Sequence, residues 1–216
     1  MKVLKLISPG NIKIKNIPIP KLNDNSLIIK IKYCAICSSD IKFINKGHRI
    51  KKYPITLGHE ISGNVIKVGK NIKKFKTGDH VVLGAEIPCG KNNCFYCNNN
   101  KKIFCENVQS VGTMINGGYA EYMIIHNNFI KNGPIIKISK KIDHKYTCLA
   151  ESFACVINGI ECADLKYNKS VLIIGSGYMG ILFVLLCKKL YKFKNVCIVD
   201  INKKKLKIAK SIGADH

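Results

Sequence analysis

A glycine-rich turn between two apolar segments constrains the fold of this chain more than any other feature. Gly175, Gly177 and Gly180 follow the apolar segment 171–174 and open the apolar segment 181–191. The first segment has the length of a buried strand and the second has the length of a helix. A strand that enters a helix through such a turn is typical of a dinucleotide-binding unit.

The residues that follow continue the same alternation. A second apolar segment, 196–199, ends at Asp200, and a Lys-rich helical pattern covers 201–212. The order strand, helix, strand, helix predicts the beginning of a doubly wound parallel sheet. The chain stops at His216, where a third strand should begin. We therefore expect an incomplete dinucleotide-binding domain, truncated before that strand.

Each position of the turn has a physical role toward a dinucleotide. The first glycine permits a tight bend, the second lets a pyrophosphate approach the backbone, and the third lets the helix pack against the strand. The helix N-terminus then offers N–H donors to the phosphates. Asp200 would accept hydrogen bonds from the ribose hydroxyls and repel a 2′-phosphate, which favours NAD over NADP. A turn that serves packing alone is the alternative. The predicted cofactor residues are Gly175, Gly177, Tyr178, Met179, Gly180 and Asp200.

The first 145 residues have a different pattern. Apolar residues alternate with lysines in short segments that Pro-Gly, Gly-Asp and Gly-Gly turns interrupt. Period-two alternation with frequent turns predicts a β-barrel or sandwich. The strands are expected at 27–33, 61–68, 80–83 and 119–125. A short helix is expected from Asp40 to Phe43, and one long helix from Tyr146 to Cys162.

Four cysteines, Cys89, Cys94, Cys97 and Cys105, fall within one polar, glycine-containing segment. Thiolates at this spacing can converge on one tetrahedral Zn²⁺, and four sulfurs close its coordination shell. Two disulfides or a coincidental cluster are the alternatives. No signal peptide is visible at the N-terminus, so we expect a reducing, cytoplasmic compartment, which favours metal over disulfides.

The formal net charge of +23 permits binding to nucleic acid. However, Arg49 is the single arginine among the 36 basic residues, and the lysines are scattered along the chain. Arginine is the residue preferred for bidentate phosphate and guanine contacts. The charge therefore indicates a solvated surface and no nucleic-acid partner, with a zinc-knuckle nucleic-acid module as the competing interpretation. The longest apolar run, 171–187, is too short to span a bilayer, so no membrane partner is expected.

A second group of possible metal ligands is dispersed along the chain. Cys37, the pair His59-Glu60 and Glu151 offer a thiolate, an imidazole and carboxylates. This mixed set suits an open, catalytic zinc site. A lone histidine is more often an ordinary surface or core residue, so spacing alone leaves both interpretations open.

With these residues in view, the chain resembles the zinc-dependent medium-chain dehydrogenases of the sorbitol/L-iditol and threonine dehydrogenase kind. The resemblance covers the whole chain through motifs in the same order: Cys-Ser-Ser-Asp (37–40), Gly-His-Glu (58–60), Gly-Asp-His-Val (78–81), the cysteine segment, Gly-Gly-Tyr-Ala-Glu-Tyr (117–122), Ala-Glu-Ser-Phe-Ala (150–154) and the glycine-rich turn. It implies a GroES-like β-barrel catalytic domain over 1–165, with a structural-zinc lobe at 89–105. It also implies the N-terminal half of a Rossmann NAD-binding domain over 166–216.

The resemblance also implies the roles of the site residues. A catalytic zinc would be held by Cys37, His59 and a carboxylate from Glu60 or Glu151, and Asp40 would orient the His59 ring. Ser39 matches the hydroxyl that passes the substrate proton toward solvent. The site would thus combine the metal ligands with Ser39, Asp40 and Glu60, and the lobe would hold the structural zinc.

Glu151 stands where the primary-alcohol branch of the family usually has a second cysteine, so the chain resembles the polyol branch. The implied reaction is oxidation of a secondary alcohol or polyol to a ketone, with hydride transfer to NAD. L-Threonine 3-dehydrogenase activity is an alternative, and so is an inactive, zinc-binding remnant. The full-length form is expected to be a dimer or tetramer.

Three local departures from the family pattern are visible. The lobe begins with Cys-x4-Cys where Cys-x2-Cys is usual. Ser152 replaces a proline, and Lys42 replaces a histidine near the end of the proton relay.

Overall fold

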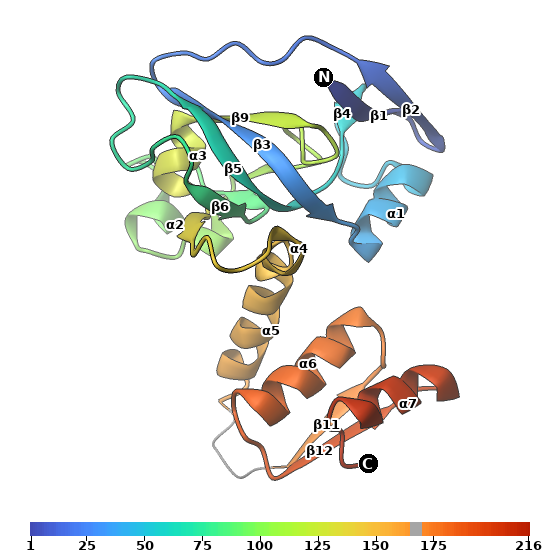
Figure 1. Cartoon of the computed structure of the whole chain (residues 1–216). Helices are drawn as coiled ribbons and strands as arrows, with labels where there is room; N and C mark the ends of the chain where they lie inside the picture. Colours follow the sequence, from blue (N-terminus) through green and yellow to red (C-terminus); the bar gives the residue numbers. More distant parts are fainter. Residues whose placement is uncertain (165–169) are drawn as a thin grey trace. The chain divides into compact units, whose positions relative to one another are not determined.

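The computed structural model describes residues 1–164 and 170–216, which form two compact units, Met1–Glu151 and Ser152–His216 (Figure 1). The sequence predicts a boundary between 165 and 166. The units divide earlier because α5 (Ala150–Cys162) buries Val156 and Ile160 in the core of the second unit. Residues 165–169, which hold the predicted boundary, lie outside the described residues.

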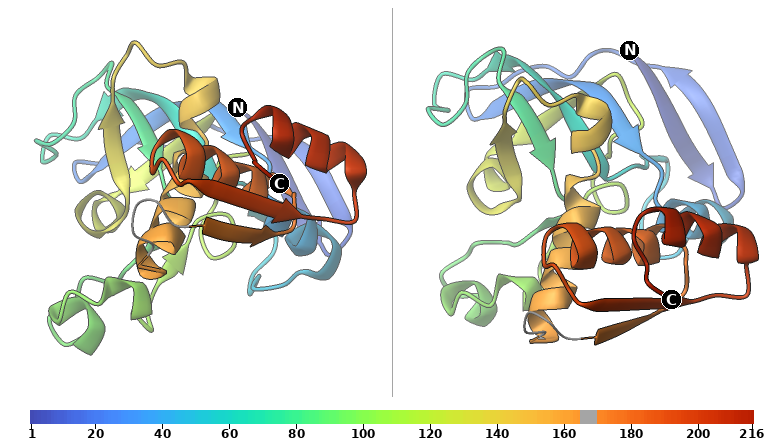
Figure 2. Two further views of the ribbon diagram at one scale, coloured as in Figure 1. Left: turned by 90° about the horizontal axis from the view of Figure 1, so that it is seen from below. Right: turned by 60° about the horizontal axis from the view of Figure 1, so that its bottom comes forward.

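The first unit is built on an antiparallel five-stranded sheet in the order β10-β6-β5-β3-β9. A smaller sheet has the order β2-β1-β4, and β7 pairs with β8. Figure 2 shows the unit from two further directions. The strands are β1 (Lys2–Ser8), β2 (Asn11–Asn16), β3 (Ser26–Ala35), β4 (Ile55–Thr56), β5 (Glu60–Val68), β6 (His80–Leu83), β7 (Glu86–Ile87), β8 (Gln109–Ser110), β9 (Tyr122–His126) and β10 (Ile135–Ile138).

Alternating apolar side chains of the large sheet form the core of this unit. Leu27 and Ile29 of β3, Ile61 of β5 and Val81 of β6 are fully buried in one cluster. Burying a Leu, Ile or Val side chain contributes about 1.5–3 kcal/mol, so a few such residues exceed the net stability of a small domain. The strands predicted at 27–33, 61–68 and 80–83 are confirmed, whereas the strand predicted at 119–125 begins only at Tyr122.

Helices cover the ends of the first unit. They are α1 (Ser38–Lys46), α2 (Phe95–Asn98), the 3-10 turn η1 (Lys102–Phe104), α3 (Asn127–Asn132) and α4 (His144–Thr147). Asp143 caps α4 by accepting a hydrogen bond from the Lys145 N–H at 2.9 Å. The single helix predicted from Tyr146 to Cys162 is wrong at its start: α4 ends at Thr147 and α5 begins anew at Ala150.

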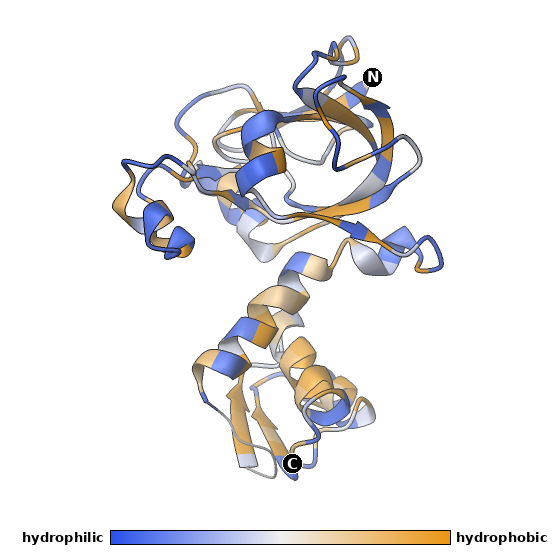
Figure 3. Ribbon diagram, turned by 90° about the vertical axis from the view of Figure 1, so that its left-hand side faces the viewer, coloured by the Kyte–Doolittle hydropathy of each residue, from blue (hydrophilic) through white to orange (hydrophobic). Residues whose placement is uncertain are grey.

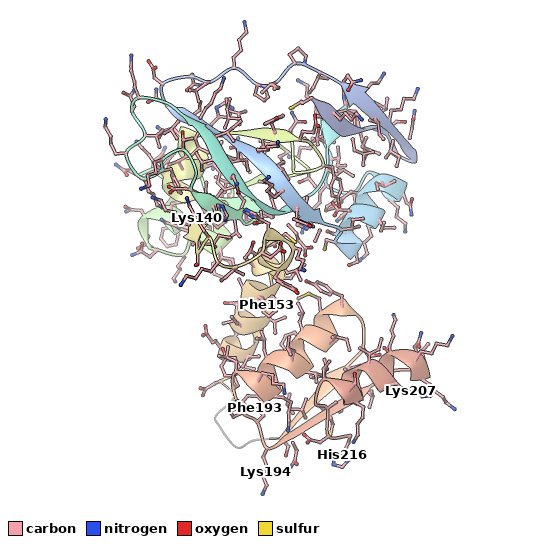
Figure 4. All side chains as sticks on the ribbon, in the orientation of Figure 1. Lys140, Phe153, Phe193, Lys194, Lys207 and His216 are labelled. Atoms are coloured by element: carbon pink, nitrogen blue, oxygen red, sulfur yellow. The ribbon has the colours of Figure 1, made fainter. Side chains whose placement is uncertain are left out.

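The second unit has the predicted alternation of strands and helices. β11 (Ser170–Ile174) and β12 (Asn195–Val199) are parallel, and α6 (Tyr178–Lys189) and α7 (Lys203–Ser211) lie against one face of the pair (Figures 1 and 2). Apolar residues concentrate along α6 and both strands (Figure 3). Ile173, Val196 and Ile198 point into the core of this unit. Figure 4 labels Phe193, a buried residue between α6 and β12, and His216.

Residues after α7 return to the free edge of β12. The Asp215 N–H donates to the Val196 carbonyl at 2.9 Å, and the Ile198 N–H donates to the His216 carbonyl at 2.8 Å. These hydrogen bonds run along the free edge of β12, while the sheet itself has two strands, β11 and β12. Among the described residues, no helix is long and apolar enough to cross a membrane.

Candidate functional site

The four cysteines of the lobe converge on one point. Their sulfur atoms all lie within 4.8 Å of one another. Cys89 Sγ is 3.8 Å from Cys97 Sγ, and Cys94 Sγ is 3.9 Å from Cys105 Sγ. A tetrahedron with Zn–S bonds of about 2.3 Å has edges of about 3.8 Å. All eleven cysteines are free thiols, so the geometry favours the metal interpretation over disulfides.

The local backbone prepares this lobe to bind a cation. The Cys89 N–H donates to Cys105 Sγ at 3.4 Å, and this hydrogen bond, with others to the same sulfur, lowers the pKa of Cys105 to about 7, whereas burial and the neighbouring thiols raise the pKa of Cys97 to about 12. Zn²⁺ binds thiolates rather than thiols, so a thiol that ionises readily suits the site. The longer first spacing, Cys-x4-Cys, does not prevent the four sulfurs from meeting.

Cys37, Asp40 and Glu151 are neighbours of His59 in the first unit, although among the described residues the cysteine lobe is the one group whose ligand atoms meet at a single metal position. His59 is 8% exposed, and its Nε2 lies 4.0 Å from Glu151 Oε2. Burial lowers the pKa of His59, but the hydrogen bond and charge of Asp40, with contributions from Cys37 and Glu151, raise it to about 9. The imidazole therefore has a carboxylate facing each ring nitrogen, that of Glu151 at Nε2 and a second one at Nδ1.

Asp40 is that second carboxylate, at the start of α1. It is 1% exposed, and its Oδ1 lies 3.6 Å from His59 Nδ1. Its Oδ2 accepts the Cys37 N–H at 3.0 Å and the Tyr119 hydroxyl at 2.7 Å. Burial raises the pKa of Asp40, but hydrogen bonds with His59 and Tyr119 lower it below its usual value. The site therefore holds a carboxylate in the position predicted for the group that orients His59.

The remaining predicted residues of this site differ in exposure. Glu60, the first residue of β5, is 2% exposed and lies near Glu151, whose pKa burial and Glu60 both raise. Ser39 lies in the first turn of α1 and is half-buried. Glu151 Oε2 is the carboxylate oxygen found 4.0 Å from His59 Nε2.

The glycine-rich turn has the conformation that its sequence predicts. Gly175 has φ of +99°, a value that favours glycine. A Cβ on Gly177 would meet nothing within 4 Å, whereas a Cβ on Gly180 would overlap the Gly175 carbonyl oxygen. The space beside Gly177 is thus open to a ligand, whereas Gly180 packs tightly against the backbone of Gly175. Tyr178 and Met179, in the first turn of α6, are 45% and 39% exposed.

Asp200 lies beside this turn, at the end of β12. Its Oδ2 accepts the Ser176 N–H at 2.6 Å and its Oδ1 accepts the Asn202 N–H at 2.7 Å. These hydrogen bonds lower its pKa to about 2, so the carboxylate is ionised at neutral pH. An anion in this place suits ribose hydroxyls and disfavours a 2′-phosphate.

Sequence reasoning missed the role of Tyr119 and a buried network at α4. Tyr119 belongs to the Gly-Gly-Tyr-Ala-Glu-Tyr motif, whose spacing gives no sign of a contact with Asp40. In the network, Ser62 Oγ lies 2.6 Å from His144 Nδ1 and 2.7 Å from Thr147 Oγ1. No local sequence signal predicts either contact, because the partners are 79 to 85 residues apart.

Comparison with known proteins agrees with this geometry. Residues 23–135, more than half of the chain, match the family model of the alcohol dehydrogenase GroES-like domain. The chain belongs to the zinc-type medium-chain alcohol and polyol dehydrogenase family. Its relatives include the zinc-type alcohol dehydrogenase-like protein YdjJ of Escherichia coli, 32% identical over 95% of this chain and 59% of that protein. Sorbitol dehydrogenase of Bacillus subtilis is 28% identical over 100% of this chain and 60% of its own length.

Solved structures of this dehydrogenase family superpose on the chain. Galactitol-1-phosphate dehydrogenase from Escherichia coli has a TM-score of 0.89 at 29% identity, over 99% of this chain and 60% of its own. RspB from Escherichia coli, in complex with NADH, has a TM-score of 0.87 at 30% identity over 100% of this chain and 61% of its own. A zinc-binding dehydrogenase from Sinorhizobium meliloti, bound to NADP, has a TM-score of 0.90 at 28% identity, over 99% of this chain and 60% of its own. The chain thus spans about 60% of the length of these relatives.

Proposed function

We propose that this chain is the zinc-binding, N-terminal portion of an NAD-dependent dehydrogenase that oxidises a secondary alcohol or polyol to a ketone. The observation that carries the proposal is that Cys37 and Glu151 are neighbours of His59, with Asp40 facing the other nitrogen of its ring. The catalytic-domain and Rossmann assignments, and a homo-oligomer of the full-length form, belong to the same proposal.

The residues present fit a catalytic zinc. Cys37 would supply a thiolate, His59 its Nε2 and Glu151 a carboxylate, which is three protein ligands from one unit. Zinc sites that catalyse reactions have three protein ligands and keep one position for water or substrate, whereas the four-cysteine lobe has no position left. Among the described residues, the buried Asp40 Oδ1 has no partner apart from the His59 ring, which faces it at 3.6 Å. Zinc bound at His59 Nε2 would leave the proton on Nδ1, and this N–H could then donate to Asp40 Oδ1.

The bound zinc would supply Lewis acidity, which lowers the pKa of a coordinated hydroxyl group. The chain's own residues would do the rest. Asp40 would hold the neutral His59 ring in one tautomer, and Ser39, half-buried beside Cys37, would accept the alcohol proton and pass it to solvent. The carbinol carbon would then transfer its hydride to the nicotinamide ring.

Glu151 and the relatives together support a polyol-type substrate. A carboxylate stands at the position where a sulfur ligand would mark the primary-alcohol branch, and one relative is a sorbitol dehydrogenase. Asp200 and the open turn at Gly177 support NAD as the hydride acceptor. The NADP-bound relative makes NADP the competing cofactor.

The experiment that tests this function measures NAD reduction by the zinc-loaded chain with a panel of polyols and secondary alcohols. Turnover that Cys37→Ser abolishes supports the proposal, with NADP as the parallel cofactor arm. A chain that carries two zinc ions and binds NAD, yet reduces none of it with any substrate, supports the second interpretation, a non-catalytic zinc-binding chain. Such a result would contradict the enzymatic proposal for this polypeptide.

A further inference from the structure

The two oxygens of the buried Asp40 carboxylate have separate partners. Oδ2 accepts two hydrogen bonds, from the Cys37 N–H at 3.0 Å and from the Tyr119 hydroxyl at 2.7 Å. Oδ1 faces His59 Nδ1 at 3.6 Å. A carboxylate with one oxygen bound by two donors cannot rotate freely, so its other oxygen stays directed at the imidazole.

We propose that Tyr119 is a positioning residue of the zinc site, which acts through Asp40 to fix the orientation of the His59 ring. The inference rests on the proposed function, because it assumes a metal at His59 Nε2. The Tyr119 hydroxyl donates to Asp40 Oδ2 at 2.7 Å and also approaches the Ala35 carbonyl at 3.3 Å, and neither residue is a proposed metal ligand, so its effect on the ligand is indirect. Groups that orient a metal-binding histidine are known to set metal affinity as well as geometry.

Tyr119 is itself held in place. Its N–H donates to the Leu57 carbonyl at 3.0 Å, and its carbonyl accepts the Leu4 N–H at 2.8 Å. The ring packs against the core cluster of Leu6, Phe43, Ile55 and Leu57. The hydroxyl therefore reaches Asp40 from a ring fixed at both its backbone and its apolar face.

The same ring also constrains the residue next to the metal ligand. Gly58 directly precedes His59, and a Cβ on Gly58 would come within 2.7 Å of the Tyr119 ring. Gly58 has φ of +89°, so a larger residue is disfavoured there for two reasons. Burial and the Asp40 charge raise the pKa of Tyr119, which keeps the phenol a hydrogen-bond donor. Tyr119 thus contacts both Asp40 and the backbone that presents His59.

The test compares Tyr119→Phe with Tyr53→Phe in the 216-residue chain. Tyr53 packs against the same apolar cluster as Tyr119, whereas the partners of Asp40 are Cys37, His59 and Tyr119, so Tyr53→Phe is a matched loss of one hydroxyl. Zinc affinity is measured by competition with a chelator, and the zinc of the four-cysteine lobe serves as the internal reference.

We expect Tyr119→Phe to weaken zinc binding at the Cys37–His59–Glu151 site by about 10–100-fold, while the lobe keeps its zinc. Tyr53→Phe should leave both affinities unchanged. In an Asp40→Asn background, Tyr119→Phe should have no further effect, because the proposed route through the carboxylate is already broken. A role in packing alone would lower the melting temperature and leave zinc affinity as in the wild type.

Two results would overturn the inference. One is unchanged zinc affinity in Tyr119→Phe. The other is a loss of zinc affinity on Tyr119→Phe that is equally large in the wild-type chain and in the Asp40→Asn background. Failure of the proposed function looks different, because Cys37→Ser would then have the same zinc content as the wild type. If Tyr119→Phe does not fold, Asp40→Asn alone tests the same route, and unchanged zinc affinity in that variant would contradict it.

Discussion

Two acids, the buried Glu60 and the half-buried Glu151, compete for the place of the third zinc ligand. They lie close enough that Glu60 raises the pKa of Glu151. Glu151 Oε2 is 4.0 Å from His59 Nε2, the nitrogen that Asp40 leaves free for a metal. Burial raises the pKa of Glu151, and a zinc ion bound there would favour the charged form of this carboxylate.

Glu151→Gln should therefore remove one zinc equivalent per chain, whereas Glu60→Gln should retain both. The amide cannot replace a charged oxygen ligand, so zinc affinity at this site should fall at least tenfold in the first variant. Elemental analysis of the dialysed proteins measures the difference. Equal zinc loss in both variants would assign the ligand to the pair, and loss in Glu60→Gln alone would reverse the assignment.

His144 supplies a pH dependence that is separate from the metal sites. It is buried, stacks on His80 at 4.5 Å between ring centroids, and has its Nδ1 within 2.6 Å of Ser62 Oγ. Burial, followed by the charges of His80 and Lys32, lowers the pKa of His144, although Asp143 opposes this. The folded chain thus binds this proton less readily than the unfolded chain.

With the folded pKa below the unfolded value of about 6.5, the free energy of unfolding should fall as pH drops below that value. The fall should be smaller in His144→Gln than in the wild type. His48→Gln, a change at an exposed histidine, should keep the wild-type pH dependence. Urea unfolding of the three proteins at pH 7.5 and 5.5 measures this. The same change in the free energy of unfolding between the two pH values in all three proteins would contradict the account.

At the scale of elements, local patterns predicted most of the strands and the whole β-α-β-α order. Val171–Ile174 and Val196–Val199 are apolar runs that only a buried strand explains, and both are strands in the structure. The helix from Tyr146 to Cys162 was predicted as one, because no Pro or Gly marks a break at Cys148. Its first turn is instead held to β5 by the contact of Thr147 with Ser62, which is 85 residues away. Contacts of that range leave no periodic signal in the sequence.

The candidate sites also divide into those that local sequence patterns predict and those that depend on long-range contacts. The cysteine lobe and the glycine-rich turn could be predicted because their spacing alone defines the chemistry. Cys37, His59 and Glu151 are far apart in the sequence, and the family resemblance connected them before the structure did. The link from Tyr119 to Asp40 spans 79 residues and had no sequence signature.

The glycine-rich turn permits a matched pair of substitutions. Gly180→Ala should lower the free energy of unfolding by about 1–3 kcal/mol, because its Cβ would overlap the Gly175 carbonyl oxygen. Gly177→Ala should be nearly neutral for stability, since its Cβ meets nothing within 4 Å, but should weaken NAD binding where the pyrophosphate must approach. Denaturant unfolding and calorimetric titration with NAD measure both effects. Equal stability losses would contradict this packing of α6.

At the scale of the whole molecule, the second unit has an apolar face that α6 and α7 do not cover. Leu172 and Ile174 of β11 and Val199 of β12 are 59%, 84% and 47% exposed. Residues 215–216 already pair with the edge of β12. In a doubly wound sheet, helices cover both faces. These exposures agree with a chain that spans about 60% of the length of its relatives.

The measurement that tests the central claim most directly is the zinc content of the purified 216-residue chain beside its Cys37→Ser and Cys94→Ser variants. The account predicts two zinc ions in the wild type, one bound by the lobe and one bound around His59. Cys37→Ser should hold one, and should keep the lobe's zinc through dialysis against a weak chelator. Cys94→Ser should lose the lobe's zinc and keep the other. A wild-type chain with one zinc ion, unchanged by Cys37→Ser, would contradict the account.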